Sequence, residues 1–313
     1  MVAAMVHVPI ERRAHLDGTA VAVLVFLTGL WGLQQVSVKV AVLDGLAPVL
    51  QAALRSLGAA VCVGLWIFWR EGRAGLASLV ARPALLPGLG VAVLFALEFV
   101  ALFPGLHLTT ASRGVVFLYS APFFVALGAH LFVPGERMSP IQTGGLFLAF
   151  AGVAAALGEG PLAGGGSLKG DLLCLAAGAF WASTTLCVRL VPALSTAPPA
   201  TLLWLQLAGS TPILFAVAWM QGDLTAWPRA GTLAWGGLFY QTVIIAFASY
   251  LVWFRLILTY PAARVAGFTF LAPVFGVVAG ALLLRERLSW GLLVGVAAIG
   301  AGMWMINRRP GMR

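Results

Sequence analysis

The sequence contains one stretch twice, about half the chain apart. Residues 113–139 read RGVVFLYSAPFFVALGAHLFVPGERMS, and residues 264–289 read RVAGFTFLAPVFGVVAGALLLRERLS. Each copy begins with an arginine, carries an Ala-Pro pair eight residues later and ends on a Glu-Arg-x-Ser motif. The apolar run between the arginine and the motif is long enough in both copies for a helix that crosses a bilayer. The two stretches therefore predict a duplicated membrane segment.

Further positions of the two halves are related by the same offset of 150 or 151 residues. The pairs are Pro48 with Pro199, Arg55 with Gln206, Gly58 with Gly209, Trp31 with Trp181, Lys39 with Arg189, and Glu136 with Glu286. Chance supplies one or two such matches, whereas this series runs in order through both halves. The whole chain is therefore interpreted as an internal duplication.

The composition favours a membrane protein and excludes an ordinary soluble one. Of the 313 residues, 61% are hydrophobic and 9% are charged, and the mean hydropathy is +0.99. A soluble domain has about 45–50% apolar and about 25% charged residues. The net charge of +9 comes mostly from arginines at the ends of apolar runs, which is typical of topology signals and not of a nucleic-acid footprint.

Apolar runs long enough to cross a bilayer core about 30 Å thick define the expected helices. There are ten, at residues 18–42, 46–69, 83–104, 109–133, 140–158, 169–190, 199–220, 232–256, 261–284 and 290–307. Each half holds five spans, an odd number, so the second copy enters the bilayer from the opposite face. We predict an all-α integral membrane protein with ten transmembrane helices arranged as two inverted five-helix repeats. Secondary transporters are often built this way, with the substrate near the midplane where the repeats meet.

The expected organisation is one membrane domain. It comprises an N-terminal segment (1–17), the first repeat (18–158), a linker (159–168), the second repeat (169–307) and a tail (308–313). The uncharged run from Gly18 to Val38 is interpreted as a retained first span. Cations gather on the segments that lie inside when the N-terminus is inside, so both termini are expected in the cytoplasm. The excess of arginine over lysine is typical of a GC-rich bacterial genome, and we expect the protein in a bacterial inner (plasma) membrane.

These motifs resemble the drug/metabolite transporter superfamily in its ten-helix EamA-type form. The matching pieces are Leu30-Trp31-Gly32 with Lys39, Arg55, Ser112 to Pro122, Gly135-Glu136-Arg137, Gly170-Asp171 with Trp181, and Pro273 with Arg285-Glu286-Arg287. The resemblance covers residues 18–307. Within the superfamily the sequence is similar to the aromatic-amino-acid exporters of the YddG type. It departs from a strict repeat at Gln206, which replaces the arginine of the first copy.

The resemblance implies a secondary transporter that exports amino acids, aromatic or bulky apolar ones, and related metabolites by alternating access. It also implies that spans one, three, four, six, eight and nine line a central cavity. Cationic drugs or other small metabolites such as purines are the alternative cargo, and the few buried cations argue against phosphorylated sugars. A passive channel is the alternative from another class, although kinked inverted halves fit alternating gates better than a fixed pore.

Glu98 is the only acidic residue deep in a predicted span, next to Phe99. An intramembrane carboxylate is costly and usually faces a cavity or a partner. Glu98 is therefore a candidate proton carrier or a ligand for a substrate amine. The alternative is a protonated side chain that hydrogen-bonds to a neighbouring helix.

Two polar and aromatic stripes occupy equivalent faces of the first and sixth spans. They consist of Trp31, Gln35 and Lys39, and of Trp181, Thr185 and Arg189, each at i, i+4 and i+8. The tryptophans are expected to stack on a substrate ring, while Gln34, Gln35, Thr184 and Thr185 hydrogen-bond to its polar end. The alternative is interhelical packing. Lys39 and Arg189 are expected to anchor at the membrane surface, and Arg55 to neutralise a carboxylate or a helix C-terminus.

The remaining candidates lie on the fourth, eighth and ninth spans. A proline inside a helix removes one backbone hydrogen bond, so a kink or hinge is expected at Pro122 and at Pro273. The other expected pathway residues are Tyr119, Ser120, Ser249, Tyr250, Trp253 and Phe268. Ser139 and Ser289 are typical helix starts, and Glu136 and Glu286 are expected near the N-termini of the helices that follow them.

Motifs for chemistry or cofactor binding are missing. The sequence has no Walker loop, GxSxG or HExxH motif, and its histidines and cysteines show no metal-ligand spacing. We therefore expect no enzyme activity, no cofactor and no metal, and energy from the substrate gradient or a coupled ion. The expected partners are a small-molecule substrate (amino acids or similar metabolites) and the lipid bilayer, without nucleic acid. Gly276 with Gly280, and Gly291 with Gly295, are interpreted as packing within a monomer rather than as a dimer seam.

Overall fold

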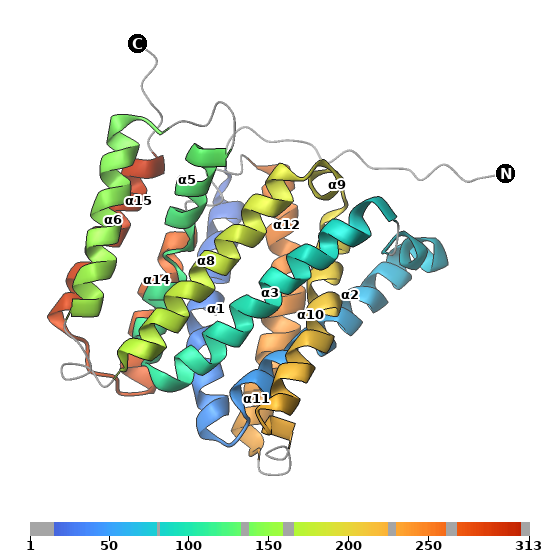
Figure 1. Cartoon of the computed structure of the whole chain (residues 1–313), viewed down its shortest axis with the longest axis horizontal. Coiled ribbons are helices and arrows are strands. Elements are labelled where there is room, and N and C mark those ends of the chain that lie inside the picture. The colour runs from blue at the N-terminus through green and yellow to red at the C-terminus, as the bar shows by residue number, and fades with distance from the viewer. Residues whose placement is uncertain are drawn as a thin grey trace.

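The computed structural model describes residues 16–79, 82–132, 138–158, 166–224, 230–260 and 268–307. Regular structure in these ranges is helical throughout (Figure 1). The first half contains α1 (Gly18–Leu43), α2 (Pro48–Leu79), α3 (Arg82–Leu108), α4 (Ala111–Leu118), α5 (Ala121–Phe132) and α6 (Pro140–Gly158). The second half contains α8 (Leu168–Leu190), α9 (Pro192–Ser195), α10 (Pro199–Met220), α11 (Thr232–Phe239), η2 (Tyr240–Ser249), α12 (Tyr250–Thr259), η3 (Phe268–Phe270), α14 (Leu271–Leu283) and α15 (Trp290–Asn307).

The helices confirm the predicted membrane fold. Within the described residues, seven helices are long and apolar enough to cross a membrane, and three shorter apolar helices lie at 140–155, 271–283 and 290–302. These ten segments fall on the ten predicted spans. The protein is an all-α integral membrane protein built from two inverted five-helix repeats.

Polar side chains cap the N-termini of several helices. Asp17 at α1 and Ser167 at α8 each accept a hydrogen bond from the backbone N–H three residues later, at 2.8 and 3.0 Å. These two caps start equivalent helices of the two repeats. Ser139 exchanges hydrogen bonds with Gln142 in a capping box at α6, and Ser289 caps α15. The helix starts predicted at Ser139 and Ser289 are confirmed.

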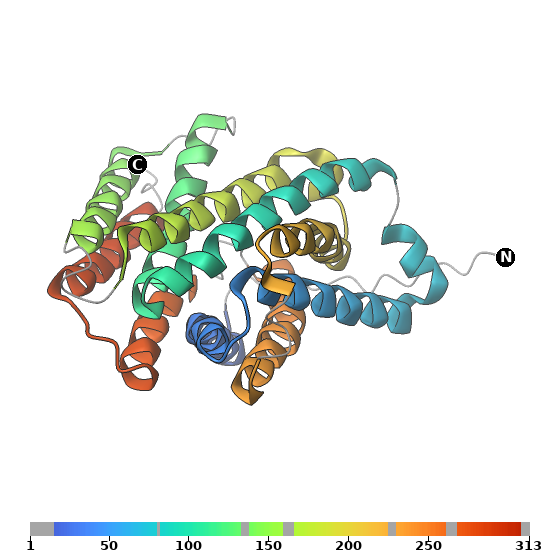
Figure 2. The ribbon, with the colours of Figure 1, turned by 60° about the horizontal axis from the view of Figure 1, so that its bottom comes forward.

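Equivalent helices of the two repeats pack against one another. α2 packs against α10, and α6 against α15, while α1 lies against α14 as α8 lies against α5. The α6–α15 pair stands side by side at one edge of the bundle in both ribbon views (Figures 1 and 2). A Cβ atom on Gly152 would come within 2.9 Å of the Gly295 carbonyl oxygen, so the small residues bring these two helices close.

The two repeated segments that carry an Ala-Pro pair are both interrupted. α4 ends at Leu118, a turn follows at Tyr119 and Ser120, and α5 begins at Ala121 with Pro122 in its first turn. In the second repeat, the 3-10 turn η3 precedes α14, which carries Pro273 in its first turn. The missing proline N–H is tolerated at a helix start, which explains why the interruption falls just before each proline.

The eighth predicted span is not a uniform α-helix. Its middle ten residues, Tyr240–Ser249, form the π-helix η2 between α11 and α12. A π-helix is rare and is frequently found at functional sites. Ser249 is its last residue, and Tyr250 begins α12 directly after it.

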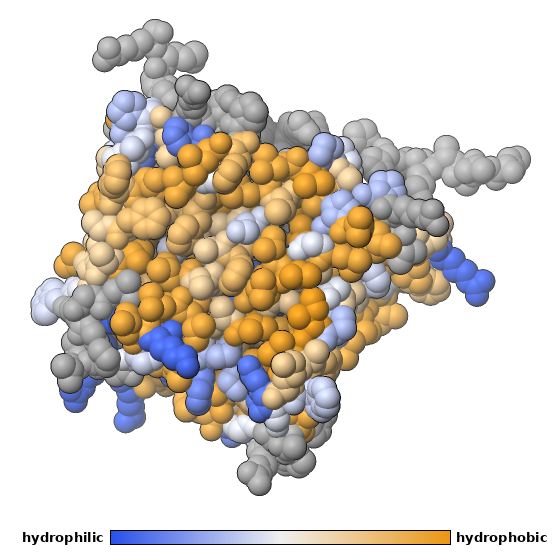
Figure 3. Space-filling view, viewed as in Figure 1, coloured by the Kyte–Doolittle hydropathy of each residue, from blue (hydrophilic) through white to orange (hydrophobic). Residues whose placement is uncertain are grey.

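The outer surface suits a bilayer. Figure 3 shows apolar side chains across the middle of the visible face, with the hydrophilic ones gathered mainly toward its upper and lower edges. Large apolar residues such as Phe26, Phe147 and Leu282 are at least 66% exposed on this chain alone. In a membrane these positions face lipid, so their exposure carries no cost.

Candidate functional site

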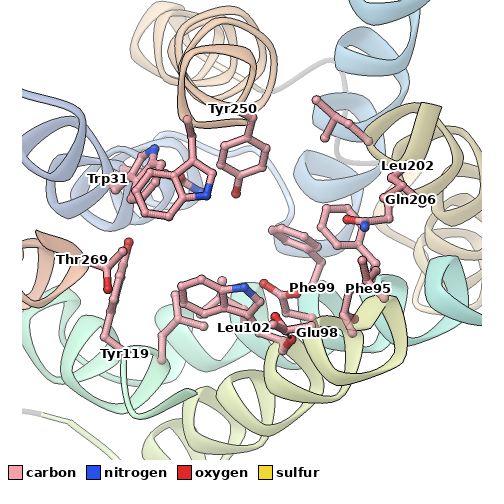
Figure 4. A pocket seen from close by; sticks show the side chains of 18 of the residues that line it. Trp31, Phe95, Glu98, Phe99, Leu102, Tyr119, Leu202, Gln206, Tyr250 and Thr269 are labelled. Carbon is pink, nitrogen blue, oxygen red and sulfur yellow. Dashed lines mark hydrogen bonds between the residues drawn. The ribbon is translucent and has the colours of Figure 1, made fainter. Parts of the chain in front are cut away.

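A cavity of about 280 Å³ lies where the two repeats meet. It is surrounded by α1, α3 and the end of α4 from the first repeat, and by α8, α10, α12 and η3 from the second. Its walls are formed by Trp31, Gln34, Gln35, Phe95, Glu98, Phe99, Leu102, Leu118, Tyr119, Trp181, Thr184, Thr185, Val188, Leu202, Leu203, Gln206, Tyr250, Trp253 and Thr269. Figure 4 shows labelled side chains from both repeats facing the same space.

Trp31, on α1 of the first repeat, is held in place by contacts with residues of the second repeat. Its indole Nε1 donates a hydrogen bond of 2.9 Å to the Ser249 hydroxyl, which in turn donates to the Ile245 carbonyl. Its ring meets Trp253 edge-on at a centroid distance of 4.9 Å and Tyr250 at 6.1 Å. Trp31 therefore reaches the cavity with its indole N–H satisfied and its ring fixed in one orientation.

Trp181 has the equivalent role on α8. Its ring contacts Tyr119 of the first repeat edge-on, with centroids 5.4 Å apart. Each repeat thus contributes a tryptophan that packs against a tyrosine of the other repeat. The two predicted aromatic stripes meet across one cavity.

Glu98 lies on the α3 wall of the cavity, beside Phe99 (Figure 4). Its side chain is 7% exposed, and within the described residues its Oε2 atom has no hydrogen-bond partner. Arg55 is fully buried, interacts electrostatically with Glu98 and places its guanidinium 4.5 Å from the centre of the Phe99 ring. Its predicted role beside a carboxylate is consistent with this position. Arg55 lies behind Phe99 and does not line the cavity.

Most of the predicted pathway residues come together. Eleven line the cavity: Trp31, Gln34, Gln35, Glu98, Phe99, Tyr119, Trp181, Thr184, Thr185, Tyr250 and Trp253. Three do not. Ser249 positions Trp31 from behind, the Ser120 hydroxyl donates to the Phe117 carbonyl, and Phe268 packs against the cluster of Ala20, Leu24 and Tyr260.

The structure adds wall residues that the sequence reasoning missed. They include Phe95 and Leu102 on α3, and Leu202, Leu203 and Gln206 on α10, the seventh span. Phe95 and Leu102 share a face with Glu98 and Phe99 at helical spacing, a signal that was available. Gln206 is the residue of the second repeat that corresponds to Arg55. It is a polar residue inside a predicted span, and this could have marked it as a candidate.

One end of the bundle is fastened by a polar latch, which consists of Lys39, Thr109, Ser112, Arg113, Asp171 and Glu286. At its centre Arg113 and Asp171 form a bidentate ion pair, with side chains only 3% and 1% exposed. The Thr109 hydroxyl donates to the same carboxylate at 2.6 Å. The pair joins α4 of the first repeat to α8 of the second.

Glu286 adds a second connection between the repeats. Its carboxylate accepts hydrogen bonds from the backbone N–H groups of Ala111 and Ser112, at 2.7 and 2.9 Å, and from the Ser112 hydroxyl at 2.6 Å. Glu286 therefore caps α4, not the helix that follows it, and the prediction for this residue was wrong. The unpaired N–H groups at the start of α4 attract the carboxylate. Glu136 lies outside the described residues.

Gly280 makes this contact possible. A Cβ atom there would lie 2.6 Å from a Glu286 carboxylate oxygen and closer still to the Ser112 hydroxyl oxygen, so a larger residue would have to displace these two side chains. Lys39 completes the latch by donating to the backbone carbonyls of Leu106 and Thr109 near the end of α3. Its expected role as a surface anchor was wrong, because the ammonium instead satisfies carbonyls at a helix C-terminus. The side chain of Arg189 lies outside the described parts of the structure.

The cavity and the latch occupy different levels of the bundle. The latch lies where α3 ends and where α4 and α8 begin. The cavity lies at mid-height and toward the opposite end, because its α8 residues fall in the second half of that helix and its α10 residues in the first two turns. The described contacts thus close the bundle on one side of the cavity.

The EamA-like transporter family model matches residues 19–158 and again residues 168–308. The two matches cover most of the chain, one in each half, and the chain therefore belongs to the EamA-like transporter family. It is a membrane transporter and not an enzyme.

Two relatives of this chain carry names that refer to efflux. The chain is 29% identical over 286 residues to a protein of Escherichia coli (strain K12) named "Probable amino-acid metabolite efflux pump", with 88% of this chain and 90% of the relative covered. It is 30% identical over 290 residues to a protein of the same name from Salmonella typhimurium, at 88% and 90% coverage. A solved crystal structure with 19% identity superposes with a TM-score of 0.62 over 92% of this chain and 97% of that chain, which shows a shared fold.

Proposed function

We propose that this transporter exports amino acids with aromatic or bulky apolar side chains, and related metabolites, by alternating access. The cavity carries the proposal, because its walls come from both inverted repeats and combine aromatic rings with a few polar groups. That combination suits a solute with a ring or branched apolar part and one polar end. The printed names of the two enterobacterial relatives support export of amino-acid metabolites.

The size of the cavity supports a small cargo. Pockets for drug-sized ligands usually measure about 300–1,000 Å³, and this cavity lies near the lower limit. A single amino acid suits such a volume better than a large drug. The seven aromatic rings on the walls favour a flat or bulky side chain over a small hydrophilic one.

The latch supports alternating access. It fastens the two repeats to each other at one end through hydrogen bonds and one ion pair, interactions that can break as a set and re-form. The interruptions before Pro122 and Pro273 supply bending points in equivalent helices. We propose that export opens the latch by bending at these points while the opposite end closes.

The expected orientation supports export. We place the protein in a bacterial inner membrane with both termini in the cytoplasm, because arginines gather on that side. The latch then lies at the outer end, and the cavity lies toward the cytoplasm. An exporter in this state is ready to load.

The test is transport by the purified protein in liposomes. Counter-flow of a panel of labelled amino acids is measured with and without a pH gradient, and liposomes without protein serve as the control. We expect counter-flow of at least one aromatic or branched apolar amino acid. Absence of counter-flow for every amino acid would end the exporter hypothesis, and single-channel currents in a planar bilayer would replace it with a channel.

A further inference from the structure

The described cavity wall contains an acidic side chain but no basic one. Among the described residues that line the cavity, Glu98 is the only one of the types Asp, Glu, Lys, Arg and His. Seven rings surround it: Trp31, Phe95, Phe99, Tyr119, Trp181, Tyr250 and Trp253. A wall of aromatic faces with one carboxylate attracts a cation, both through the carboxylate and through the rings.

Buried polar atoms on the wall also await a partner. Within the described part of the chain, Glu98 Oε2 on α3, Gln35 Oε1 on α1 and Thr184 Oγ1 on α8 have no hydrogen-bond partner, although each is buried. The Gln35 amide oxygen accepts hydrogen bonds and cannot donate them, and the same holds for the Glu98 carboxylate in its ionised form. An ammonium group offers three donors and no acceptor, so it complements this set. A buried polar atom left unpaired is costly, and a bound ammonium would remove that cost.

A substrate carboxylate finds no equivalent charge. Arg55 is fully buried, interacts electrostatically with Glu98 and stands 4.5 Å from the centre of the Phe99 ring, and its three guanidinium nitrogens have no hydrogen-bond partner among the described residues. Because Phe99 lines the cavity and Arg55 does not, a solute meets the ring before the guanidinium. A carboxylate in the cavity would meet only neutral donors such as the side chains of Gln34 and Gln206.

Resting on the proposed function, we infer that the site recognises the ammonium group and the apolar side chain of an amino acid, and not its carboxylate. Primary amines and carboxamides that share the side chain of a transported amino acid therefore bind at least as well as the amino acid itself. Deaminated acids and N-acylated amino acids bind poorly, because they leave Glu98 without a cation and bring a second negative charge beside it.

The test measures binding and transport separately, with phenylalanine as the reference. Phenethylamine, phenylalaninamide, 3-phenylpropionate and N-acetylphenylalanine are added to the purified protein, and thermal stabilisation and inhibition of labelled phenylalanine counter-flow are recorded. We expect the first two to bind as tightly as phenylalanine or more tightly. The last two should bind at least tenfold more weakly.

Two variants sharpen the result. Glu98→Gln keeps the shape of the side chain and should weaken phenethylamine binding at least tenfold. Glu71→Gln removes an exposed carboxylate at the far end of α2 and should change nothing. If 3-phenylpropionate binds as well as phenylalanine and loses its binding in Arg55→Gln, the carboxylate is recognised through Arg55 and the inference is wrong.

Failure of the proposed function would look different. If phenethylamine binds and depends on Glu98 while no amino acid shows counter-flow, recognition of the ammonium group stands and amino-acid export does not. If phenylalanine shows counter-flow but phenethylamine does not bind, export stands and the inference is overturned.

Discussion

Asp171 is the latch residue whose replacement has the most predictable effect. Its carboxylate is 1% exposed and forms the bidentate pair with Arg113, which is 3% exposed. Asp171→Asn keeps the shape of the side chain but leaves the Arg113 guanidinium buried without its counter-ion. Removal of one partner of a buried pair costs about 3–5 kcal/mol.

This cost falls on the latched state, because in the proposed cycle the pair separates when the latch opens. At about 1.4 kcal/mol per factor of ten, the ratio of latched to unlatched protein falls roughly a hundredfold to several thousandfold. We therefore expect Asp171→Asn to hold the outer end open and to slow export, since the protein rarely returns to the state that loads substrate.

Cys174 reports on this opening. It lies three residues after Asp171, is fully buried, and packs against Gly105 and Gly114 near the latch. In a Cys62→Ser/Cys187→Ser background it is the only cysteine of the chain. A maleimide that cannot cross membranes should label Cys174 from outside at least tenfold faster in Asp171→Asn than in the parent.

The matched control replaces both partners. In Arg113→Met/Asp171→Leu no buried charge is left unpaired, so the outer end should close again and labelling should return toward the parent rate. Monodisperse elution from a sizing column establishes that each variant is folded. If folded Asp171→Asn is labelled no faster than the parent, the latch does not govern access and the reasoning is refuted.

Three further predictions concern the cavity and the helix packing. Trp31→Ala and Trp181→Ala should each weaken substrate binding about tenfold, because aromatic contacts contribute about 0.5–1.5 kcal/mol beyond their buried area; unchanged titration curves for both would exclude an aromatic wall. Glu98→Gln should flatten the dependence of transport on pH, since it removes the only carboxyl group among the described residues that line the cavity; a profile like that of the parent in proteoliposomes would favour a structural carboxylate. Gly32→Ala should destabilise the protein by about 1–3 kcal/mol, because the new Cβ would lie 2.6 Å from the Gly276 nitrogen and 2.7 Å from the Ala272 oxygen. Gly300→Ala is the control, since a Cβ atom there meets nothing within 4 Å. Equal thermal unfolding temperatures of the two variants would contradict this packing.

The sequence predicts the fold well because the bilayer restricts the choices. Apolar runs between arginines mark the spans, and the offset between Arg113 and Arg264 reveals the duplication. Five spans per copy then require inversion. The structure confirms these steps, and the serine caps at Ser139 and Ser289 confirm two of the helix starts.

The cavity was predicted in part, because stripes of aromatic and polar residues stand out against an apolar background. Trp31 and Trp181 were found in this way. Leu102 and Leu203 were not, since a leucine that lines a cavity looks the same in the sequence as one that faces lipid. The π-helix at Tyr240–Ser249 leaves no recognisable pattern either.

The partner of Glu286 could not be predicted, because it lies in the other repeat. Glu286 and Ser112 are separated by 174 residues, and no periodicity relates a loop to the start of a distant helix. Only the packing of α14 against α4, allowed by Gly280, brings them together. The same reason hid the ion pair between Arg113 and Asp171, although each residue belonged to a recognised motif.

Alternating access is tested most directly by locking the latch with a covalent bond. Ser112 on α4 and Gly280 on α14 are close enough that a Ser112→Cys/Gly280→Cys pair, in a background without other cysteines, is expected to form a disulfide between the repeats. Counter-flow of a labelled substrate is then compared in oxidised and reduced proteoliposomes. We expect oxidation to stop transport and reduction to restore it. Equal counter-flow with the disulfide formed would mean that substrate passes without opening the latch.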